Sequence, residues 1–136
     1  SSAKAIAVLG ASTANDAHLI QWGYTPTTHN DEWNFTRIGT SGYYRITNVL
    51  SGKDMAVYSV SMANGAHLVQ YTYSSASPYN DEFEVADVGS GYYKIVARHS
   101  GLVLNVEGAL LTDGIHIVQW PYSAVPQSQW QLTLIP

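Results

Sequence analysis

Residues 51–73 (SGKDMAVYSVSMANGAHLVQYTY) and residues 100–122 (SGLVLNVEGALLTDGIHIVQWPY) are two copies of one pattern, and residues 2–24 (SAKAIAVLGASTANDAHLIQWGY) are a third. They align without a gap at a spacing of 49 residues, as the histidines show: 67 − 18 = 49 and 116 − 67 = 49. A unit that recurs at a fixed period is the signature of a repeat architecture, so this repeat determines the fold.

The unit has the composition of short β-strands and turns. In the second unit, a tyrosine-rich segment follows Ser-Gly, and the pair Asn64-Gly65 predicts a type I′ hairpin turn, in which both central residues have positive φ. Asp113-Gly114 and Asn15-Asp16 hold the equivalent places. No helical periodicity is present. The strands expected in the second unit are 43–47, 55–57, 67–71 and 83–85, and their equivalents in the third are 92–96, 104–106, 116–120 and 130–132.

Four strands in each of three units are the plan of an all-β β-trefoil, whereas a propeller typically needs 4–8 blades. We expect a single domain over residues 1–136, with repeats at approximately 1–40, 41–89 and 90–136. The first unit begins at the equivalent of the Ser-Gly turn, so its first strand is missing. Either the N-terminus has been trimmed or another segment takes that place.

Composition excludes several classes of partner. The 136 residues suit one domain, and a net charge of −4 with six Lys+Arg provides no basic stripe for nucleic acid. No apolar run approaches the ~20 residues that span a bilayer, so no membrane insertion is expected. Cysteine is absent, which rules out disulfides and Cys-ligated zinc.

Polar–aromatic motifs recur in register with the repeat. Strands end on Gln21-Trp22, Gln70-Tyr71 and Gln119-Trp120, and the units close on NDEW (30–33), NDEF (80–83) and QSQW (127–130). With these motifs the whole chain resembles the R-type (ricin B-chain-like) lectins and carbohydrate-binding module family 13, in particular their cysteine-free branch.

The resemblance implies a shallow sugar pocket in each repeat. An aromatic ring stacks on the apolar face of a pyranose, and side chains of the closing motif bind its hydroxyl groups. The implied stacking residues are Trp22, Tyr71 and Trp120. The implied polar residues are Asn30 and Asp31 in the first unit, Asn80 and Asp81 in the second, and Gln127 in the third.

The sequence departs from the family at a further position. Where the family has an Asp between two apolar residues, this chain has Ala7, Ala56 and Asn105. Alanine offers no acceptor to a hydroxyl group, so we expect the first two pockets to be weak, silent or rewired through Asp31 and Asp81. Asn105 with Trp120 is our first choice for a working site.

Strand alternation bears on these interpretations. Counting from Leu19, Leu68 and Ile117 as core residues, the aromatic residue three positions along faces away from the core, which favours sugar stacking over core packing. By the same count Gln21, Gln70 and Gln119 face inward and are expected to tie strands together. Tyr24, Tyr73 and Tyr122 follow the strands and either brace the pocket wall or provide a stacking face.

The three repeated histidines permit a metal interpretation, because imidazoles related by threefold symmetry can meet on the axis. No carboxylate or second His accompanies His18, His67 or His116 locally, and each follows a turn. The sequence therefore favours plain hydrogen bonding at strand starts, with sugar contact as an alternative, and we expect no metal and no cofactor.

The sequence predicts a non-catalytic lectin or carbohydrate-binding module for galactose-containing or xylan-type glycans. The adjacent pairs Asp31/Glu32 and Asp81/Glu82 belong to the recurring motif and do not indicate glycoside hydrolysis. An attached catalytic domain, such as that of a secreted glycoside hydrolase, and an extracellular location are further expectations. The alternative is a trefoil for protein interaction, a protease inhibitor or toxin subunit, with decayed sugar sites.

Overall fold

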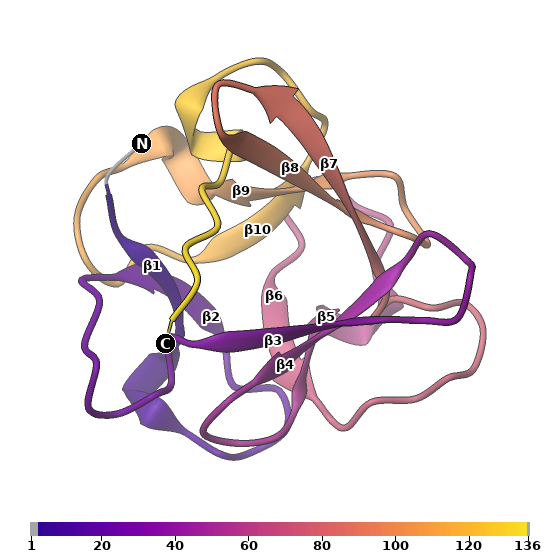
Figure 1. The fold of residues 1–136 in the computed structure, drawn as a ribbon, viewed down its shortest axis with the longest axis horizontal. Coiled ribbons are helices and arrows are strands. Elements are labelled where there is room, and N and C mark those ends of the chain that lie inside the picture. Colours follow the sequence, from indigo (N-terminus) through magenta and orange to yellow (C-terminus); the bar gives the residue numbers. More distant parts are fainter. Residues whose placement is uncertain (1–2, 136) are drawn as a thin grey trace.

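The computed structural model describes residues 3–135, which form short β-strands joined by turns and loops, without any α-helix (Figure 1). No helix in this part of the chain is long and apolar enough to cross a membrane. The strands are β1 (Ala5–Val8), β2 (Leu19–Trp22), β3 (Trp33–Arg37), β4 (Tyr44–Asn48), β5 (Asp54–Val57), β6 (Leu68–Tyr71), β7 (Phe83–Gly89), β8 (Tyr92–Ala97), β9 (Val103–Val106) and β10 (Ile117–Trp120).

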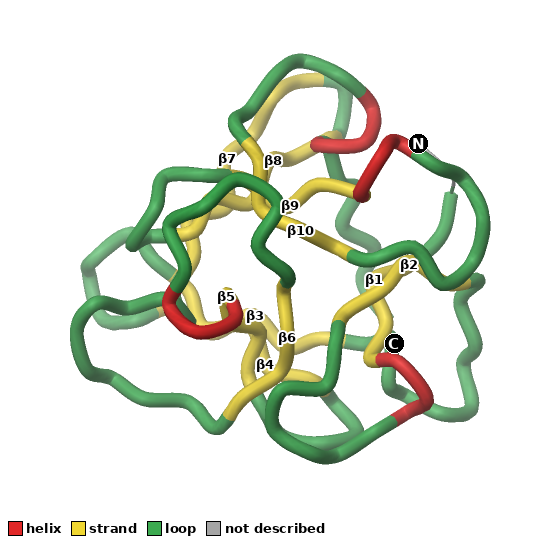
Figure 2. Tube along the Cα trace, turned by 180° about the vertical axis from the view of Figure 1, so that it is seen from behind, coloured by secondary structure: helices red, strands yellow, loops and turns green. Residues whose placement is uncertain are grey.

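Three equivalent antiparallel hairpins, β1–β2, β5–β6 and β9–β10, form one end of the molecule. Figure 2 shows β2, β6 and β10 converging around the centre, which we call the central axis. Single bridges join these strands to one another there: His18 pairs with Val69, His67 with Val118 and His116 with Ile20. The predicted all-β trefoil of three repeats is therefore confirmed.

The hairpin turns differ from the prediction. Asn64-Gly65 does not join two strands directly, because β5 ends at Val57 and β6 begins at Leu68, with the 3-10 turn Tyr58–Val60 between them. Gly65 has φ 84°, but Asn64 is not among the residues with positive φ, so the predicted type I′ turn is wrong. The Gly supplies a left-handed residue inside a longer loop.

The core is formed by the residues that point inward from all three repeats. Leu19, Leu68 and Ile117 are each fully buried at equivalent positions, and Phe83 is the largest fully buried side chain among the described residues. These apolar side chains form one cluster, as expected for a single trefoil domain.

The strand that closes each repeat is not paired equally in the three repeats. β3 pairs with β4 and β7 pairs with β8, but in the third repeat only Trp130 forms a bridge, to Tyr93. The predicted strand 130–132 is thus reduced to one residue, because no described segment pairs with its other side. In Figure 1 the C-terminal segment runs alone towards the start of β3. It borders a groove of about 1250 Å³ that residues of β1 and β3 also line.

Candidate functional site

The three implied stacking residues lie at the outer ends of the hairpin strands. Trp22, Tyr71 and Trp120 are the last residues of β2, β6 and β10 and are 44%, 45% and 46% exposed. The expectation that they face away from the core is confirmed. Large rings left this exposed at three equivalent positions provide flat apolar surfaces for a ligand.

The three glutamines one position earlier face inward, as predicted. The amide nitrogen of Gln70 donates to the carbonyl oxygens of Ser12 (2.9 Å) and Ala14 (2.9 Å), in the preceding repeat. Gln119 donates in the same way to Ser61 and Ala63 of the second repeat. Gln21 donates to Leu110 and Thr112 of the third. These buried glutamines tie each repeat to its neighbour, and this fixes the position of the aromatic residue that follows.

Each aromatic ring lies against a loop of another repeat. A Cβ placed on Gly65 would come within 3.9 Å of the Trp120 ring, and one placed on Gly114 within 3.9 Å of the Trp22 ring. Asp16 occupies the position of these glycines in the loop nearest to Tyr71. The candidate pockets therefore lie at the boundaries between repeats, and each has one wall from a neighbouring hairpin loop.

The position where the family has Asp lies beside the aromatic ring. Asn105 on β9 pairs with Val118 on β10. Val118 lies two residues before Trp120, so the side chains of Asn105 and Trp120 are on the same face of the hairpin. Ala56 pairs with Val69 in β5–β6, and Ala7 with Ile20 in β1–β2. All three positions are buried, and Ala56 lines a cavity together with Tyr71.

Each repeat contains one buried side-chain oxygen without a hydrogen-bond partner. These atoms are Oδ1 of Asp31, of Asp81 and of Asn105, and the other buried unpaired atom in the described chain is Nδ1 of His99. A buried acceptor without a donor typically costs about 1–3 kcal/mol. All three oxygens belong to residues predicted from the sequence to bind sugar.

The acceptor comes from the closing motif in the first two repeats. Oδ2 of Asp81 accepts the N–H of Ser74 (2.9 Å), and Oδ2 of Asp31 accepts the N–H of Thr25 (2.6 Å). The second oxygen of each carboxylate stays free of protein donors. Burial raises the pKa of Asp81 above its ordinary value, against the opposing effect of hydrogen bonds from the backbone N–H groups of Ser74 and of Asp81 itself.

In the third repeat the equivalent residue has another function. Ser128 is fully buried, and its Oγ donates to the carbonyl oxygens of Ser123 (2.7 Å) and Val125 (3.1 Å). The proton of this hydroxyl is used within the loop, and its oxygen is not among the buried unpaired acceptors. Here the free oxygen comes from Asn105 on β9.

A cavity of about 360 Å³ lies at the second pocket, and Tyr71, Ala56, Asn80 and Asp81 line it. Ala56, which stands where the family has Asp, leaves room in this cavity, and Asp81 also lines it. All three residues predicted for this repeat, Tyr71, Asn80 and Asp81, are therefore brought together. The groove of about 1250 Å³ beside the C-terminal segment is lined in part by Asp31 and Gln127.

Sequence reasoning missed Asp16, which also lines the second pocket. It is exposed and has φ 67°, where the equivalent loops of the other repeats have Gly65 and Gly114. A non-glycine residue with positive φ is uncommon and is enriched at functional sites. The repeat alignment contained this signal, because an acidic residue stands where two equivalent units have glycine.

The motif asparagines are partly used by the scaffold. The amide nitrogen of Asn80 donates to the carbonyl oxygen of Val57 (2.9 Å), and that of Asn30 to Val8 (3.0 Å). These bonds hold the closing motif against the hairpin of the same repeat. Gln127, the residue at this position in the third repeat, is half-buried in the short 3-10 turn Pro126–Ser128.

The repeated tyrosines hold the pocket wall together. The hydroxyl of Tyr73 donates to Glu82 (2.8 Å), that of Tyr24 donates to Glu32, and Gln129 donates to the hydroxyl of Tyr122 (3.2 Å). The hydrogen bond to Glu32 raises the pKa of Tyr24 to about 12, while burial and Glu82 raise that of Tyr73 to about 12. This supports the bracing interpretation of these tyrosines.

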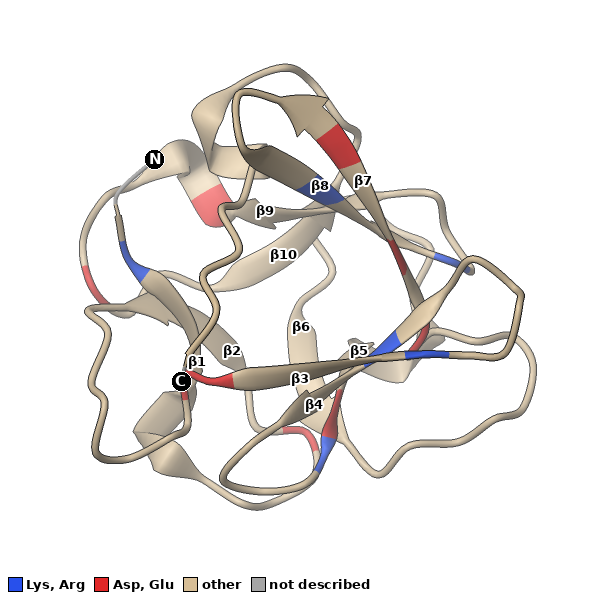
Figure 3. Ribbon diagram, in the orientation of Figure 1, with Lys and Arg blue, Asp and Glu red and all other residues tan. Residues whose placement is uncertain are grey.

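The basic side chains are spread over several strands and loops and alternate with acidic ones (Figure 3). Several of them lie over tyrosine rings or pair with acids within the domain. Arg98 contacts Glu82 (2.6 Å) and lies 4.0 Å from the Tyr79 ring centroid, and Arg45 contacts Asp54 (2.9 Å). The Arg98–Glu82 pair joins the third repeat to the second, whereas Arg45 and Asp54 both belong to the second repeat.

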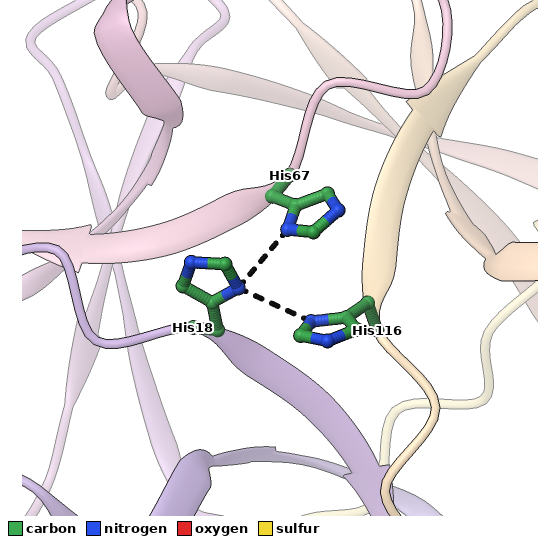
Figure 4. A group of neighbouring side chains, drawn as sticks. All are labelled: His18, His67 and His116. Atoms are coloured by element: carbon green, nitrogen blue, oxygen red, sulfur yellow. Dashed lines mark hydrogen bonds between the residues drawn. The ribbon is translucent and has the colours of Figure 1, made fainter.

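The structure brings together the three histidines that the sequence analysis assigned to plain hydrogen bonding. His18, His67 and His116 start the converging strands and meet on the central axis (Figure 4). Their backbone carbonyl oxygens accept hydrogen bonds from the N–H groups of Leu9, Tyr58 and Glu107, which fits the expected hydrogen bonding at strand starts. Their side chains, however, contact one another.

Solved structures share this fold closely. A designed threefold-symmetric protein, ThreeFoil, is 40% identical with a TM-score of 0.93, over 98% of this chain and 93% of that one. An exo-beta-1,3-galactanase from Clostridium thermocellum, 1,3Gal43A, is 34% identical with a TM-score of 0.92, over 98% of this chain but only 28% of that one. The Rhizoctonia solani agglutinin shares the fold at 16% identity, with a TM-score of 0.80, over 93% of this chain and 83% of that one.

No curated protein matches the chain in a search by sequence. A family profile described as ricin-type beta-trefoil lectin domain-like matches residues 1–76 and 79–135. This match covers all three candidate pockets and supports carbohydrate binding as the general function. The chain belongs to the ricin-type beta-trefoil lectin-like family.

Proposed function

We propose that this chain is a non-catalytic module that binds galactose-containing glycans through shallow pockets between its repeats. The observation that carries the proposal is the recurrence, once in each repeat, of a buried unpaired oxygen near an exposed aromatic residue. A pyranose complements this pair, because its C–H face stacks on a ring while its hydroxyl groups donate hydrogen bonds.

The three pockets are not expected to be equal. The second has a defined cavity, a free carboxylate oxygen and Asp16 on its rim. The third has the larger ring, Trp120, and the neutral acceptor of Asn105. Weak sites of this kind gain affinity when several engage one polysaccharide, provided that the ligand spans them.

Galactose-containing glycans are preferred over xylan-type glycans because of the 34% identity to a segment of an exo-beta-1,3-galactanase. The chain spans only 28% of that enzyme, so we also propose that it acts beside an attached catalytic domain, outside the cell. The chain itself is proposed to be non-catalytic, because its unpaired carboxylates lie in separate repeats instead of facing each other across one pocket.

The protein-interaction alternative rested on Ala7 and Ala56. The free oxygens of Asp31 and Asp81 weaken it, since these repeats keep a buried acceptor despite the alanines. The observations therefore favour rewired sugar sites over decayed ones in the first and second repeats.

The test is a pull-down with insoluble galactan and xylan, followed by a glycan array. We expect retention on galactan that is strongly reduced when Tyr71→Ala and Trp120→Ala are combined. Phe35→Ala is a matched control, because this aromatic residue is 37% exposed on β3, outside the three hairpins. An array without hits, or equal loss in the control, would refute the proposal.

A further inference from the structure

Three imidazole rings meet on the central axis, one from each repeat (Figure 4). Nδ1 of His18 lies 3.0 Å from Nδ1 of His67 and 3.2 Å from Nδ1 of His116. One ring nitrogen from each of the three residues falls within 4.8 Å of those of the other two. We call these residues the axial histidines.

The fold holds the axial histidines in this arrangement. His18 pairs with Val69, two residues after His67; His67 pairs with Val118, and His116 pairs with Ile20. Each histidine backbone is thus anchored to a strand of another repeat. The following residues Leu19, Leu68 and Ile117 are fully buried in the core, which restricts movement of the strand starts. The rings therefore converge as a result of the repeat and its closure.

Hydrogen bonding alone does not account for the contacts of His18. A neutral ring nitrogen is either a donor or an acceptor for one partner, so Nδ1 of His18 can make a good hydrogen bond to only one of its two neighbours. A cation that accepts a lone pair from each nitrogen satisfies all three rings together.

The spacing of the nitrogens suits a transition-metal ion. Zn–N bonds of 2.0–2.1 Å in tetrahedral geometry place ligand nitrogens about 3.3 Å apart. The separations of 3.0 and 3.2 Å are close to this value. The rings of His67 and His116 are stacked, so they must turn for both nitrogens to reach one ion. Imidazole nitrogens suit Zn²⁺, Cu²⁺ and Ni²⁺, whereas Ca²⁺ and Mg²⁺ require oxygen ligands.

We propose that His18, His67 and His116 bind one Zn²⁺-class divalent metal ion on the central axis, with the fourth position open to water. The axial histidines are only half-buried, so an ion and a water molecule can reach them from solvent. Such an ion links the three repeats at one point and stabilises the folded chain by binding it in preference to the unfolded chain. This site is separate from the sugar pockets.

The test uses the purified chain after treatment with a chelator. Titration with ZnCl₂ in a calorimeter is expected to give one ion per chain and a rise in the thermal unfolding midpoint, with no response to CaCl₂ or MgCl₂. His67→Asn is expected to weaken zinc binding at least about a hundredfold, since one of three ligands is lost. His29→Asn is the matched control and is expected to bind as the wild type, because His29 is exposed and contacts only Glu32 among charged groups.

Cobalt gives a second readout on the unaltered chain. Co²⁺ bound to three nitrogens and a water is expected to show the strong visible absorption of tetrahedral geometry, which Zn²⁺ then displaces. Weak octahedral absorption, a stoichiometry other than one, or equal zinc binding by His67→Asn would overturn the proposal. If His67→Asn does not fold, the cobalt spectrum of the wild type decides. Trp120→Ala is expected to retain zinc binding, so failure of the sugar proposal leaves this one intact.

Discussion

The second and third pockets use the same scaffold and take their free oxygen from different elements. In the second, Ala56 leaves room in the cavity and the closing motif provides Oδ1 of Asp81. In the third, Asn105 on β9 provides the oxygen, while Ser128 at the position of Asp81 is used within its own loop. Both pockets therefore have a free acceptor, which the closing motif provides in the second pocket and β9 provides in the third.

This difference has a physical origin in burial. A carboxylate from the closing motif and a polar side chain at the position of Ala56 would lie in the same small volume, and two buried acceptors there would compete for donors. Among the described residues, each repeat has one such unpaired oxygen. The charged acceptor of the second pocket and the neutral one of the third should therefore respond differently to mutation.

The largest effect is expected from Asp81→Ala. A hydrogen bond to a charged group contributes about 1.5–3 kcal/mol, so affinity in the second pocket should fall roughly tenfold to a hundredfold. NMR titration with galactose can follow the two pockets separately through amides near Tyr71 and Trp120. Unchanged binding at Tyr71, or equal weakening at Trp120, would contradict the proposed source of the acceptor.

A smaller effect is expected from Asn105→Ala in the third pocket. The lost hydrogen bond is neutral and contributes about 0.5–1.5 kcal/mol, which corresponds to roughly a twofold to tenfold loss of affinity. The same NMR titration should show no change at Tyr71. If instead Asn105→Ala abolishes binding in both pockets, the pockets are not independent and the comparison fails.

Asp16→Gly tests the rim of the second pocket. The exposed carboxylate is expected to contribute less than about 1 kcal/mol, so affinity should fall no more than about fivefold. The folded chain should be as stable as the wild type or more stable, since glycine adopts the observed φ of 67° without strain. Chemical denaturation measures this, and a clear loss of stability would indicate a structural role for the carboxylate.

The smallest effect concerns stability and pH. Burial raises the folded-state pKa of Asp81 above 3.8, so between 3.8 and that raised pKa the folded state binds more protons than the unfolded state. The unfolding free energy therefore loses a contribution as pH rises through this window. Asp81→Asn removes the charge, and its stability relative to the wild type should be greater at about pH 7 than at about pH 3. Chemical denaturation at both pH values measures this. The prediction is contradicted if the difference in midpoint between Asp81→Asn and the wild type is the same at both pH values or is greater at about pH 3.

Much of the fold and of the candidate site could be predicted from the repeat. Alternation along the strands correctly placed Leu19 in the core, Gln21 inward and Trp22 outward, because side-chain direction in a strand follows from local sequence. Asp31, Asp81 and Asn105, selected from the family motif, carry the buried unpaired oxygens, and their sugar contacts stay predictions.

Other features could not be predicted because they depend on how the repeats meet. Asp16 reaches the pocket of a different repeat, across the boundary that the buried glutamines fix. The segment 130–132 lacks a full strand because strand formation needs a partner, and that requirement is not local. The prediction of a type I′ turn at Asn64-Gly65 was wrong because this dipeptide lies within a longer loop.

The sequence by itself determined the threefold β plan, the faces of its strands and the residues of its candidate pockets, since a strand's periodicity is written in consecutive residues. Only the tertiary structure decided which oxygens remain unpaired and that His18, His67 and His116 meet on one axis. These residues are 49 positions apart in the chain, and only closure of the trefoil brings their side chains within contact distance.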